Sequence, residues 1–327
     1  MLPGSRPKIN DGTPEAETCV MDDVKSAPPG SPPQVSVPRR SRAGRWWLAV
    51  AAAALLVAGT VTAMAVYRTE TKPGWQLAWS DDFNGSTLDL SKWTPENRST
   101  FGDGNKELAC LMSRRANVEV AGGMLTLRAI RERTPVVCGD NDSRFPNGRP
   151  YTSAMLSTEG KASWHQGRFE IRAKLPLAAG RSKGLWPAFW MRPATGSADG
   201  ELDIMEAIGT ADGQDPEAGS VHQTLWYDGK GTYPKQSHVA PVQGGPAGGF
   251  HTYAAEWQDG VMRWYVDGQL SFERDSSTAP WIDRAFAGEF YIRLNMAVGG
   301  TFPGSPTSDT DLPAEMVVDW VKVFQWR

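Results

Sequence analysis

Residues 200–209 read GELDIMEAIG and place three carboxylates, Glu201, Asp203 and Glu206, among large apolar side chains. In a strand, side chains alternate between the two faces, so Glu201 and Asp203 share a face while Glu206 points to the opposite one. One extra residue at positions 204–205, a β-bulge, would bring Glu206 back to the face of the other two acids. The stretch therefore predicts a bulged strand that carries three acids on one face.

The neighbours of these acids are typical of a central strand. Ile204, Met205 and Ile208 lie within the stretch, and the apolar segment GLWPAFWMRP comes just upstream. The solvated face of an edge strand is one alternative, but unpaired charges are costly in such apolar surroundings. A calcium site is another, although calcium loops usually draw on Gly, Asn and backbone carbonyls in irregular turns.

Three carboxylates on one face repel one another, which raises at least one pKa and keeps a proton available near neutral pH. Retaining glycosidases use two carboxyl groups about 5 to 5.5 Å apart, one as nucleophile and one as an acid that later acts as a base. Positions i and i+2 of a strand are roughly 7 Å apart by rise alone, which flexible acids can shorten. The spacing is therefore compatible with this chemistry.

From Trp75 onward, short alternating segments are separated by turn residues, and no amphipathic helix of ten or more residues is predicted. In QGRFEIRAKLP (166–176) and EFYIRLNMAVGG (289–300), apolar residues alternate with polar ones, so each strand has one inward face. Asp259-Gly260 and Asp267-Gly268 are expected to close two consecutive hairpins, because Asp-Gly favours tight turns.

About 250 residues of such strands, without βαβ alternation, predict an all-β sandwich of two sheets around one core. A curved sandwich has a concave face. We expect the polar side chains of Glu170, Arg172 and Asn295 to line one groove there, together with the three acids.

The first 74 residues differ from the rest in composition. Residues 1–45 contain eight Pro and mixed charges, which predicts a disordered tail. Residues 46–67 carry no charge over 22 residues, enough for one transmembrane helix, and residues 68–74 form a linker. Positive charge just before the helix predicts a cytoplasmic tail and an extracellular C-terminal part, and it is supplied by Arg39, Arg40, Arg42 and Arg45. Cleavage after Ala63-Met64-Ala65 is the alternative and would give a secreted protein.

The overall composition excludes nucleic acid as a partner, because a formal net charge of -3 over 327 residues offers no concentrated positive surface. The 14 Trp are typical of a β-rich protein with an aromatic-lined groove. The four His lack the spacing of a zinc site. On the predicted extracellular side, Cys110 and Cys138 either form a disulfide or remain two free thiols.

The stretch GELDIMEAIG resembles the active-site signature ExDxxE of glycoside hydrolase family 16. Other segments resemble the family in the expected order: DDFNGSTLDLSKW, YTSAMLSTEGKASWHQGRFEIRAKLP, GLWPAFWM, FHTYAAEWQDGVMRWYVDG and LNMAVGGTFPG. The resemblance covers residues 75–327 and implies a catalytic domain with a concanavalin-like β-jelly roll and a concave substrate cleft. It also implies retaining cleavage of β-linked polysaccharide, with no redox cofactor.

Carried over to this sequence, the resemblance makes Glu201 the nucleophile and Glu206 the general acid/base, with Asp203 tuning both through hydrogen bonds. The bulged ExDxxE form resembles the branch that contains laminarinases, agarases and carrageenases. The segments GLWPAFWM and NMAVGG then point to an endo-β-1,3-glucanase, and we expect a monomer.

Binding residues follow from the same resemblance. Trp186 and Trp190 resemble cleft positions whose indole faces stack on sugar rings, with core packing as the alternative. His222 resembles a histidine near the acid/base, with a structural role as the alternative. Hydroxyl binding by Glu170, Arg172 and Asn295 competes with ordinary cross-strand pairing. A structural calcium ion away from the cleft is implied at Asp82, Gly123 and Asp319.

Two segments depart from the laminarinase pattern, the Gly-rich residues 222–249 and the insertion at 131–150, and they leave the polysaccharide open. A transglycosylase or a β-galactan hydrolase on the same scaffold remains an alternative. A non-catalytic, carbohydrate-binding wall protein is another, although it has no need of all three acids.

Overall fold

The computed structural model describes residues 73–327, except residues 140, 197–198 and 228–234. The predicted tail (1–45) and transmembrane helix (46–67) lie outside the described residues, as does most of the linker. Within the described part, no helix is long and apolar enough to cross a membrane. The membrane span therefore stays a prediction from the sequence.

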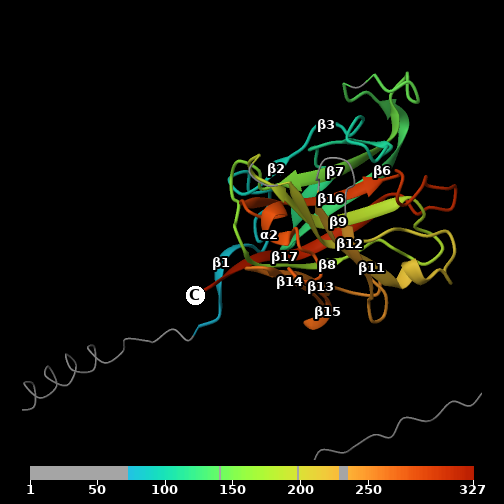
Figure 1. Ribbon diagram of the computed structural model, residues 1–327. Coiled ribbons are helices and arrows are strands. Elements are labelled where there is room, and N and C mark those ends of the chain that lie inside the picture. Colours follow the sequence, from blue (N-terminus) through green and yellow to red (C-terminus); the bar gives the residue numbers. More distant parts are fainter. Residues whose placement is uncertain (1–72, 140, 197–198, 228–234) are drawn as a thin grey trace, which may run out of the picture. The chain divides into compact units, whose positions relative to one another are not determined.

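The described chain folds into two sheets of antiparallel strands packed face to face (Figure 1). The first, here called the cleft sheet, has the order β2 (Thr94–Pro95), β7 (Arg149–Ser157), β16 (Phe290–Val298), β9 (Leu185–Pro193), β10 (Gly200–Glu206), β11 (Ser220–Tyr227) and β12 (Lys235–Pro241). The central position of β10 agrees with the apolar neighbours of its acids.

The second sheet, here called the outer sheet, has the order β5 (Val118–Ala121), β6 (Met124–Val136), β17 (Ala314–Trp326), β8 (Gly167–Lys174), β13 (His251–Gln258), β14 (Val261–Val266) and β15 (Gln269–Asp275). Strand β1 (Trp75–Asp81) pairs with the C-terminal half of β17. The end of β6 pairs with β7 and so joins the two sheets. Two short strands, β3 (Arg98–Ser99) and β4 (Ala109–Leu111), extend this corner, where β4 runs parallel to β7.

Alternation along the strands builds the single core between the sheets. On β8, Phe169 and Ile171 are buried in it, and on β16 the same holds for Ile292 and Leu294. Helices are limited, in the described residues, to η2 (Pro216–Gly219) and α2 (Ile282–Ala285). The predicted all-β sandwich is thereby confirmed.

Both predicted hairpins are present. Asp259-Gly260 joins β13 to β14, and Asp267-Gly268 joins β14 to β15. Asp267 (φ 49°) and Gly268 (φ 75°) both adopt the left-handed backbone that a tight two-residue hairpin turn requires.

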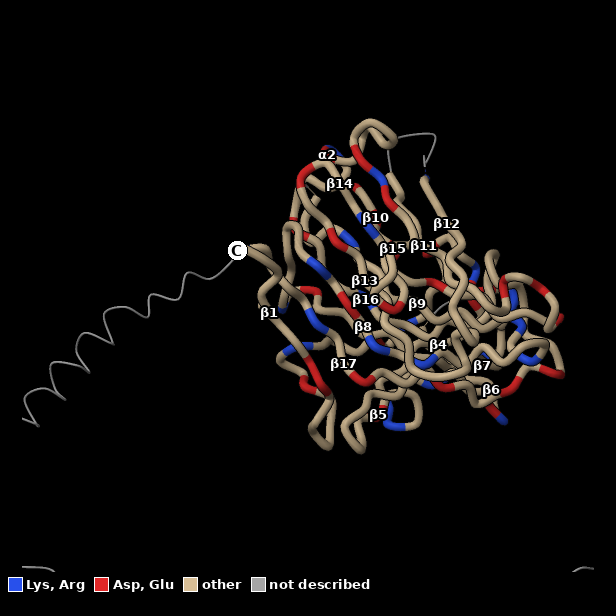
Figure 2. Tube along the Cα trace, turned by 90° about the horizontal axis from the view of Figure 1, so that it is seen from below, with Lys and Arg blue, Asp and Glu red and all other residues tan. Residues whose placement is uncertain are grey.

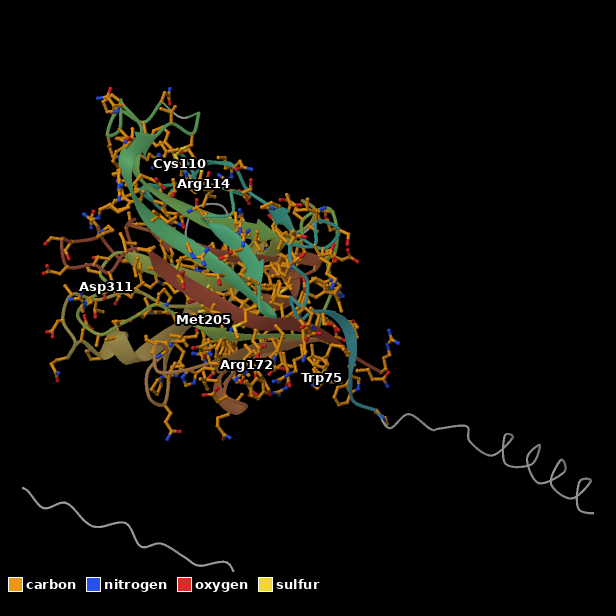
Figure 3. The ribbon with its side chains drawn as sticks, turned by 180° about the vertical axis from the view of Figure 1, so that it is seen from behind. Trp75, Cys110, Arg114, Arg172, Met205 and Asp311 are labelled. Atoms are coloured by element: carbon orange, nitrogen blue, oxygen red, sulfur yellow. A yellow bond between two sulfur atoms is a disulfide. The ribbon has the colours of Figure 1, made fainter. Side chains whose placement is uncertain are left out.

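The grouping of Glu170 and Arg172 with the acids was wrong. Their strand, β8, belongs to the outer sheet, and both side chains lie on its solvated face (Arg172 is labelled in Figure 3). Basic and acidic positions are interspersed along this face, as the tube in Figure 2 shows near β8, β13 and β17. The prediction failed because strands of both sheets alternate in the same way, so alternation does not tell which sheet a strand joins.

Cys110 and Cys138 form a disulfide, with their Cα atoms 5.8 Å apart. The bridge ties β4 to the segment that follows β6, beside the protruding ends of β6 and β7 (Figure 3). Of the two alternatives left by the sequence, the structure therefore has the disulfide.

Candidate active site

Strand β10 contains the predicted bulge. Asp203 pairs with Thr224 of β11, whereas Glu206 pairs with His222, so three steps along β10 match two along β11. The pairing with β9 places the extra residue between Asp203 and Met205. The odd spacing of the third acid is therefore a bulge, as expected from the sequence.

The bulge separates the side chains of β10 into two groups. Leu202 and the consecutive residues Ile204 and Met205 are all buried in the core, and Met205 is labelled in Figure 3. Glu201, Asp203 and Glu206 line a cleft of about 990 Å³ on the other side of the sheet. Two successive core residues are what returns the third acid to the cleft.

The cleft crosses the cleft sheet from β12 to β7, and the segment that contains residues 100–107 contributes to its wall. Alternate residues of β9, β11 and β16 face it, because their neighbours in sequence face the core. They include Trp186, Trp190, Arg192, His222, Thr224, Trp226, Arg293 and Asn295.

Each acid has a specific hydrogen-bond donor. The indole Nε1 of Trp226 donates to Oδ2 of Asp203 over 2.9 Å. That of Trp186 donates to Oε1 of Glu206, also over 2.9 Å. Glu201 instead receives a charged donor, Nη1 of Arg192, at 2.7 Å from Oε2. The nucleophile candidate is thus held by a cation and the other two acids by neutral groups.

The pKa values of Asp203 and Glu206 are both raised. Desolvation, and then the charge of Glu201, raises the pKa of Glu206 to about 7, although its indole donor opposes the shift. Desolvation, followed by the charges of Glu206 and Glu201, raises the pKa of Asp203 well above its usual range. A side-chain hydrogen bond also joins Asp203 to Glu206. Glu206 can both give and take a proton in this pH range.

Four of the six predicted binding residues line the cleft. Trp186 is only 8% exposed and Trp190 is half-buried. The Nε1 of Trp190 donates to Oδ1 of Asn295 over 2.7 Å, which fixes both side chains on neighbouring strands. His222 lies opposite Glu206 in the β10–β11 pairing, as expected, and its Nε2 hydrogen-bonds Glu217. Glu170 and Arg172, on the outer sheet, are the two that do not reach the cleft.

The residues suggested for calcium lie away from the cleft lining. The carboxylate of Asp82 is 3.7 Å from Nζ of Lys322, and that of Asp319 pairs with Arg172. Gly123 lies next to the side chain of Asn84. Among the described residues, no group of three or more His, Cys, Asp and Glu is placed to hold a metal ion. The calcium site stays a prediction.

Several cleft residues were not predicted from the sequence. Arg192 and Trp226 follow cleft residues at even spacing on β9 and β11, so alternation was a signal that could have found them. Glu107 and Phe302 belong to connecting segments, where no periodicity indicates which way a side chain points.

Comparison with known proteins agrees with this geometry. Residues 104–322 match the family model of glycosyl hydrolases family 16. The Beta-glucanase of Rhodothermus marinus is 39% identical over 274 residues, which cover 79% of this chain and 88% of that protein. Glucan endo-1,3-beta-glucosidase A1 of Niallia circulans is 35% identical over 287 residues, which cover 79% of this chain and 39% of that protein's length.

Comparison with solved structures gives proteins of the same kind. The solved structure of an endo-beta-1,3-glucanase from Pyrococcus furiosus aligns with a TM-score of 0.65 at 32% identity, covering 79% of this chain and 97% of that one. The sandwich is therefore a jelly roll of the kind found in laminarinases. With a family model matched over most of the described chain and three acids on one face of its cleft, the protein belongs to glycosyl hydrolases family 16 and is a glycosidase.

Proposed function

We propose that this protein is a retaining endo-glycosidase that hydrolyses β-1,3-glucan by double displacement. Glu201 attacks the anomeric carbon while Glu206 protonates the departing glycosidic oxygen, which gives a covalent glycosyl-enzyme. Glu206, now a carboxylate, takes a proton from water, whose oxygen displaces Glu201 and restores both groups. The observation that carries the proposal is the bulge, because it brings both acids to one face of one cleft.

The environment of each acid supports its role. The guanidinium of Arg192 favours the carboxylate form of Glu201, as a nucleophile requires. Glu206, with a pKa of about 7, is poised to act as acid and then as base. Asp203, whose pKa is raised by burial and by the two neighbouring acids, hydrogen-bonds Glu206 and helps to position it.

The substrate is inferred from the relatives and from the cleft. Relatives named as glucanases and endo-1,3-beta-glucosidases match most of the described chain. The cleft runs across several strands, which suits internal cleavage of a polymer. We assign sugar contacts to Trp186, Trp190, His222 and Asn295, and expect a single chain to suffice.

A panel of polysaccharides tests this assignment. The protein is incubated with a β-1,3-glucan, a mixed-linkage β-glucan and a β-galactan, and new reducing ends are measured together with the anomeric configuration of the first product. We expect the highest kcat/KM on the β-1,3-glucan and a β-anomer as first product. Binding without new reducing ends on any of them would indicate a carbohydrate-binding protein instead. Products longer than the substrate would identify a transglycosylase.

For the location, we propose a single-pass membrane protein with residues 75–327 outside the cell. The support is the uncharged run at 46–67 and the arginines that precede it. Sequencing the N-terminus of the mature protein tests it. A mature chain that begins near Val66 and is found free in the medium would show a cleaved signal and a secreted enzyme.

A further inference from the structure

Another acid, the buried Glu107, lines the cleft and takes no part in the proposed mechanism. It lies on the connection between β3 and β4, at the β16 side of β10, and is 8% exposed. Charged groups near it come from three elements: Arg98 on β3, Asp103 on the same connection and Arg293 on β16. Among the described residues, Glu107 itself forms no ion pair.

The charged side chains near Glu107 form ion pairs with other residues. Nη1 of Arg98 is 2.6 Å from Oδ2 of Asp103. Nη2 of Arg293 is 2.8 Å from Oε1 of Glu96, and the other oxygen of Glu96 accepts from Nε of Arg98. These pairs leave the carboxyl of Glu107 without a dedicated cation in the described part of the chain.

The backbone around Glu107 is held in place. Nη1 of the buried Arg149 donates to the carbonyl oxygen of Glu107 over 2.8 Å. The amide of Thr301 donates to the carbonyl oxygen of Asn105, also over 2.8 Å. A pre-formed carboxyl in a cleft has the rigidity that ligand binding favours.

Glu107 also lies beside the partner of the acid/base. A Cβ placed on Gly300 would be 3.6 Å from Cγ of Glu107 and 3.5 Å from the ring of Trp186, so both side chains flank this glycine. The ring of Trp186 donates its N–H to Glu206. A sugar unit next to the scissile bond on the β16 side therefore comes within reach of Glu107.

A second polar group lies on the wall at the same end of the cleft. Nε of Arg293 is buried and has no hydrogen-bond partner within the residues that the structure describes. Buried polar atoms normally have a partner, so one left over on a cleft wall indicates a place where a ligand supplies it. Glu107 and Arg293 together offer a polar recess that matches the hydroxyl groups of a neutral sugar.

We propose that Glu107 is a substrate-binding residue whose carboxyl hydrogen-bonds a hydroxyl of the sugar unit bound on the β16 side of β10, next to Trp186. This inference rests on the proposed glycosidase function. An uncharged carboxyl suits the task, because it donates one hydrogen bond and accepts another, as a hydroxyl does.

The bond depends on pH. Burial, and then the charge of Asp103, raises the pKa of Glu107 to about 7, while a hydrogen bond with Thr100 and the charges of Arg98 and Arg293 oppose the shift. Above that pH the carboxyl loses its proton and can no longer donate, so substrate affinity falls as the pH rises through 7.

Binding measurements on a catalytically inactive background test this role. In the full-length protein that carries both Glu201→Gln and Glu206→Gln, so that Glu206 no longer titrates in this pH range, the Kd of a β-1,3-linked glucose hexamer is measured by calorimetry at pH 6 and pH 9. The added substitution is Glu107→Gln, Glu107→Ala or, as a control from the outer sheet, Glu170→Gln. We expect Kd to rise about tenfold between pH 6 and pH 9 in the background and its Glu170→Gln control. Glu107→Gln should nearly remove this dependence, and Glu107→Ala should weaken binding about tenfold at pH 6.

Two outcomes would overturn the inference, and they differ from failure of the proposed function. An unchanged pH dependence in Glu107→Gln, with affinity retained in Glu107→Ala, would exclude Glu107 from binding while leaving the glycosidase intact. Failure of the parent protein to cleave any β-1,3-glucan would reject both. If Glu107→Ala does not fold, Glu107→Gln alone decides, because it keeps the shape and hydrogen bonding of the side chain and removes only the titration.

Discussion

Strands β8 and β10 both have polar side chains on the face that points away from the core, yet the two faces have opposite chemistry: β8 carries one acid, Glu170, between two arginines, whereas β10 carries three acids. On β8, Glu170 is 3.3 Å from Arg168, which also binds Glu256 of β13 at 2.8 Å. On β10, Asp203 and Glu206 accept hydrogen bonds from indole N–H groups. The same sequence pattern thus gives a neutralised surface in one sheet and a reactive one in the other.

The difference shows that the hydrogen-bond or ion-pair partner of a carboxyl group determines the chemical role that this group can have. A guanidinium beside a carboxylate stabilises the charged form of the acid. An indole supplies one hydrogen bond but no charge, so desolvation and neighbouring acids dominate and the pKa of Glu206 rises to about 7. Glu201 has both kinds of neighbour, because Arg192 donates a hydrogen bond to it and Asp203 and Glu206 line the same cleft.

Removal of the nucleophile should have the largest effect on this contrast. Glu201→Gln keeps the shape of the side chain but cannot form the covalent intermediate, so kcat on β-1,3-glucan should fall about 10⁴-fold or more. Oligosaccharide binding should persist. Release of reducing ends and calorimetry measure the two quantities, and Glu170→Gln serves as the matched control. Residual activity within tenfold of the parent would reject Glu201 as nucleophile.

Replacing the acid/base should lower activity and change its pH profile. Glu206→Gln should reduce kcat about 10³-fold, because no group then protonates the leaving oxygen. In the parent, the protonated form acts first, so kcat falls as the pH rises through about 7. This alkaline limb should be absent in the variant, as measured by kcat between pH 5 and pH 9. If kcat of the variant still falls as the pH rises through about 7, a group other than Glu206 is responsible for the decrease.

The raised pKa of Glu206 should also appear in stability. The folded protein keeps this proton up to about pH 7, whereas the unfolded chain releases it near the ordinary value of 4.5, so the free energy of unfolding decreases between these pH values. Glu206→Gln removes this pH dependence. The decrease in the free energy of unfolding from pH 5 to pH 8 should therefore be smaller in the variant than in the parent, by about 1 to 3 kcal/mol. Denaturant unfolding of parent and variant at both pH values measures the difference. An equal change in the free energy of unfolding between the two pH values in parent and variant would contradict a raised pKa of Glu206.

The smallest effect is expected on the outer sheet. Glu170→Gln breaks one ion pair at the solvated face, and such pairs contribute about 1 kcal/mol or less. Activity should stay within about twofold of the parent. A tenfold loss of kcat/KM would show that the outer face takes part in catalysis, and the contrast between the two strands would then fail.

Much of this architecture was predictable from the sequence. Alternation identified the inward faces of β8 and β16, and Asp-Gly pairs located both hairpins. The bulge was predictable because, without it, the out-of-phase Glu206 would point into the apolar core, where burying its charge is costly. Trp190 and Asn295 face the cleft as expected, since each follows the period of its strand.

The errors have physical causes. The alternation of a strand does not indicate which sheet the strand joins. For this reason Glu170 and Arg172 were wrongly predicted to lie in the cleft. Glu107 was missed because its position depends on a connection held by the distant Arg149, a contact 42 residues away in sequence. Desolvation, the largest cause of the raised pKa of Asp203, arises only when side chains from neighbouring strands enclose the cleft around it.

The bulge in β10 has a consequence for how such an enzyme can change over time. Deleting the single codon for Ile204 would restore strict alternation and would still leave all three acids facing the cleft, now spaced by two residues each. Two lineages can therefore differ in the length of this strand by one residue without passing through an ancestor that lacks the acid/base. An insertion elsewhere within β10 or within β11 would instead turn the side chains that follow it to the opposite face, so within these two strands the bulge is the place where a change of length is tolerated.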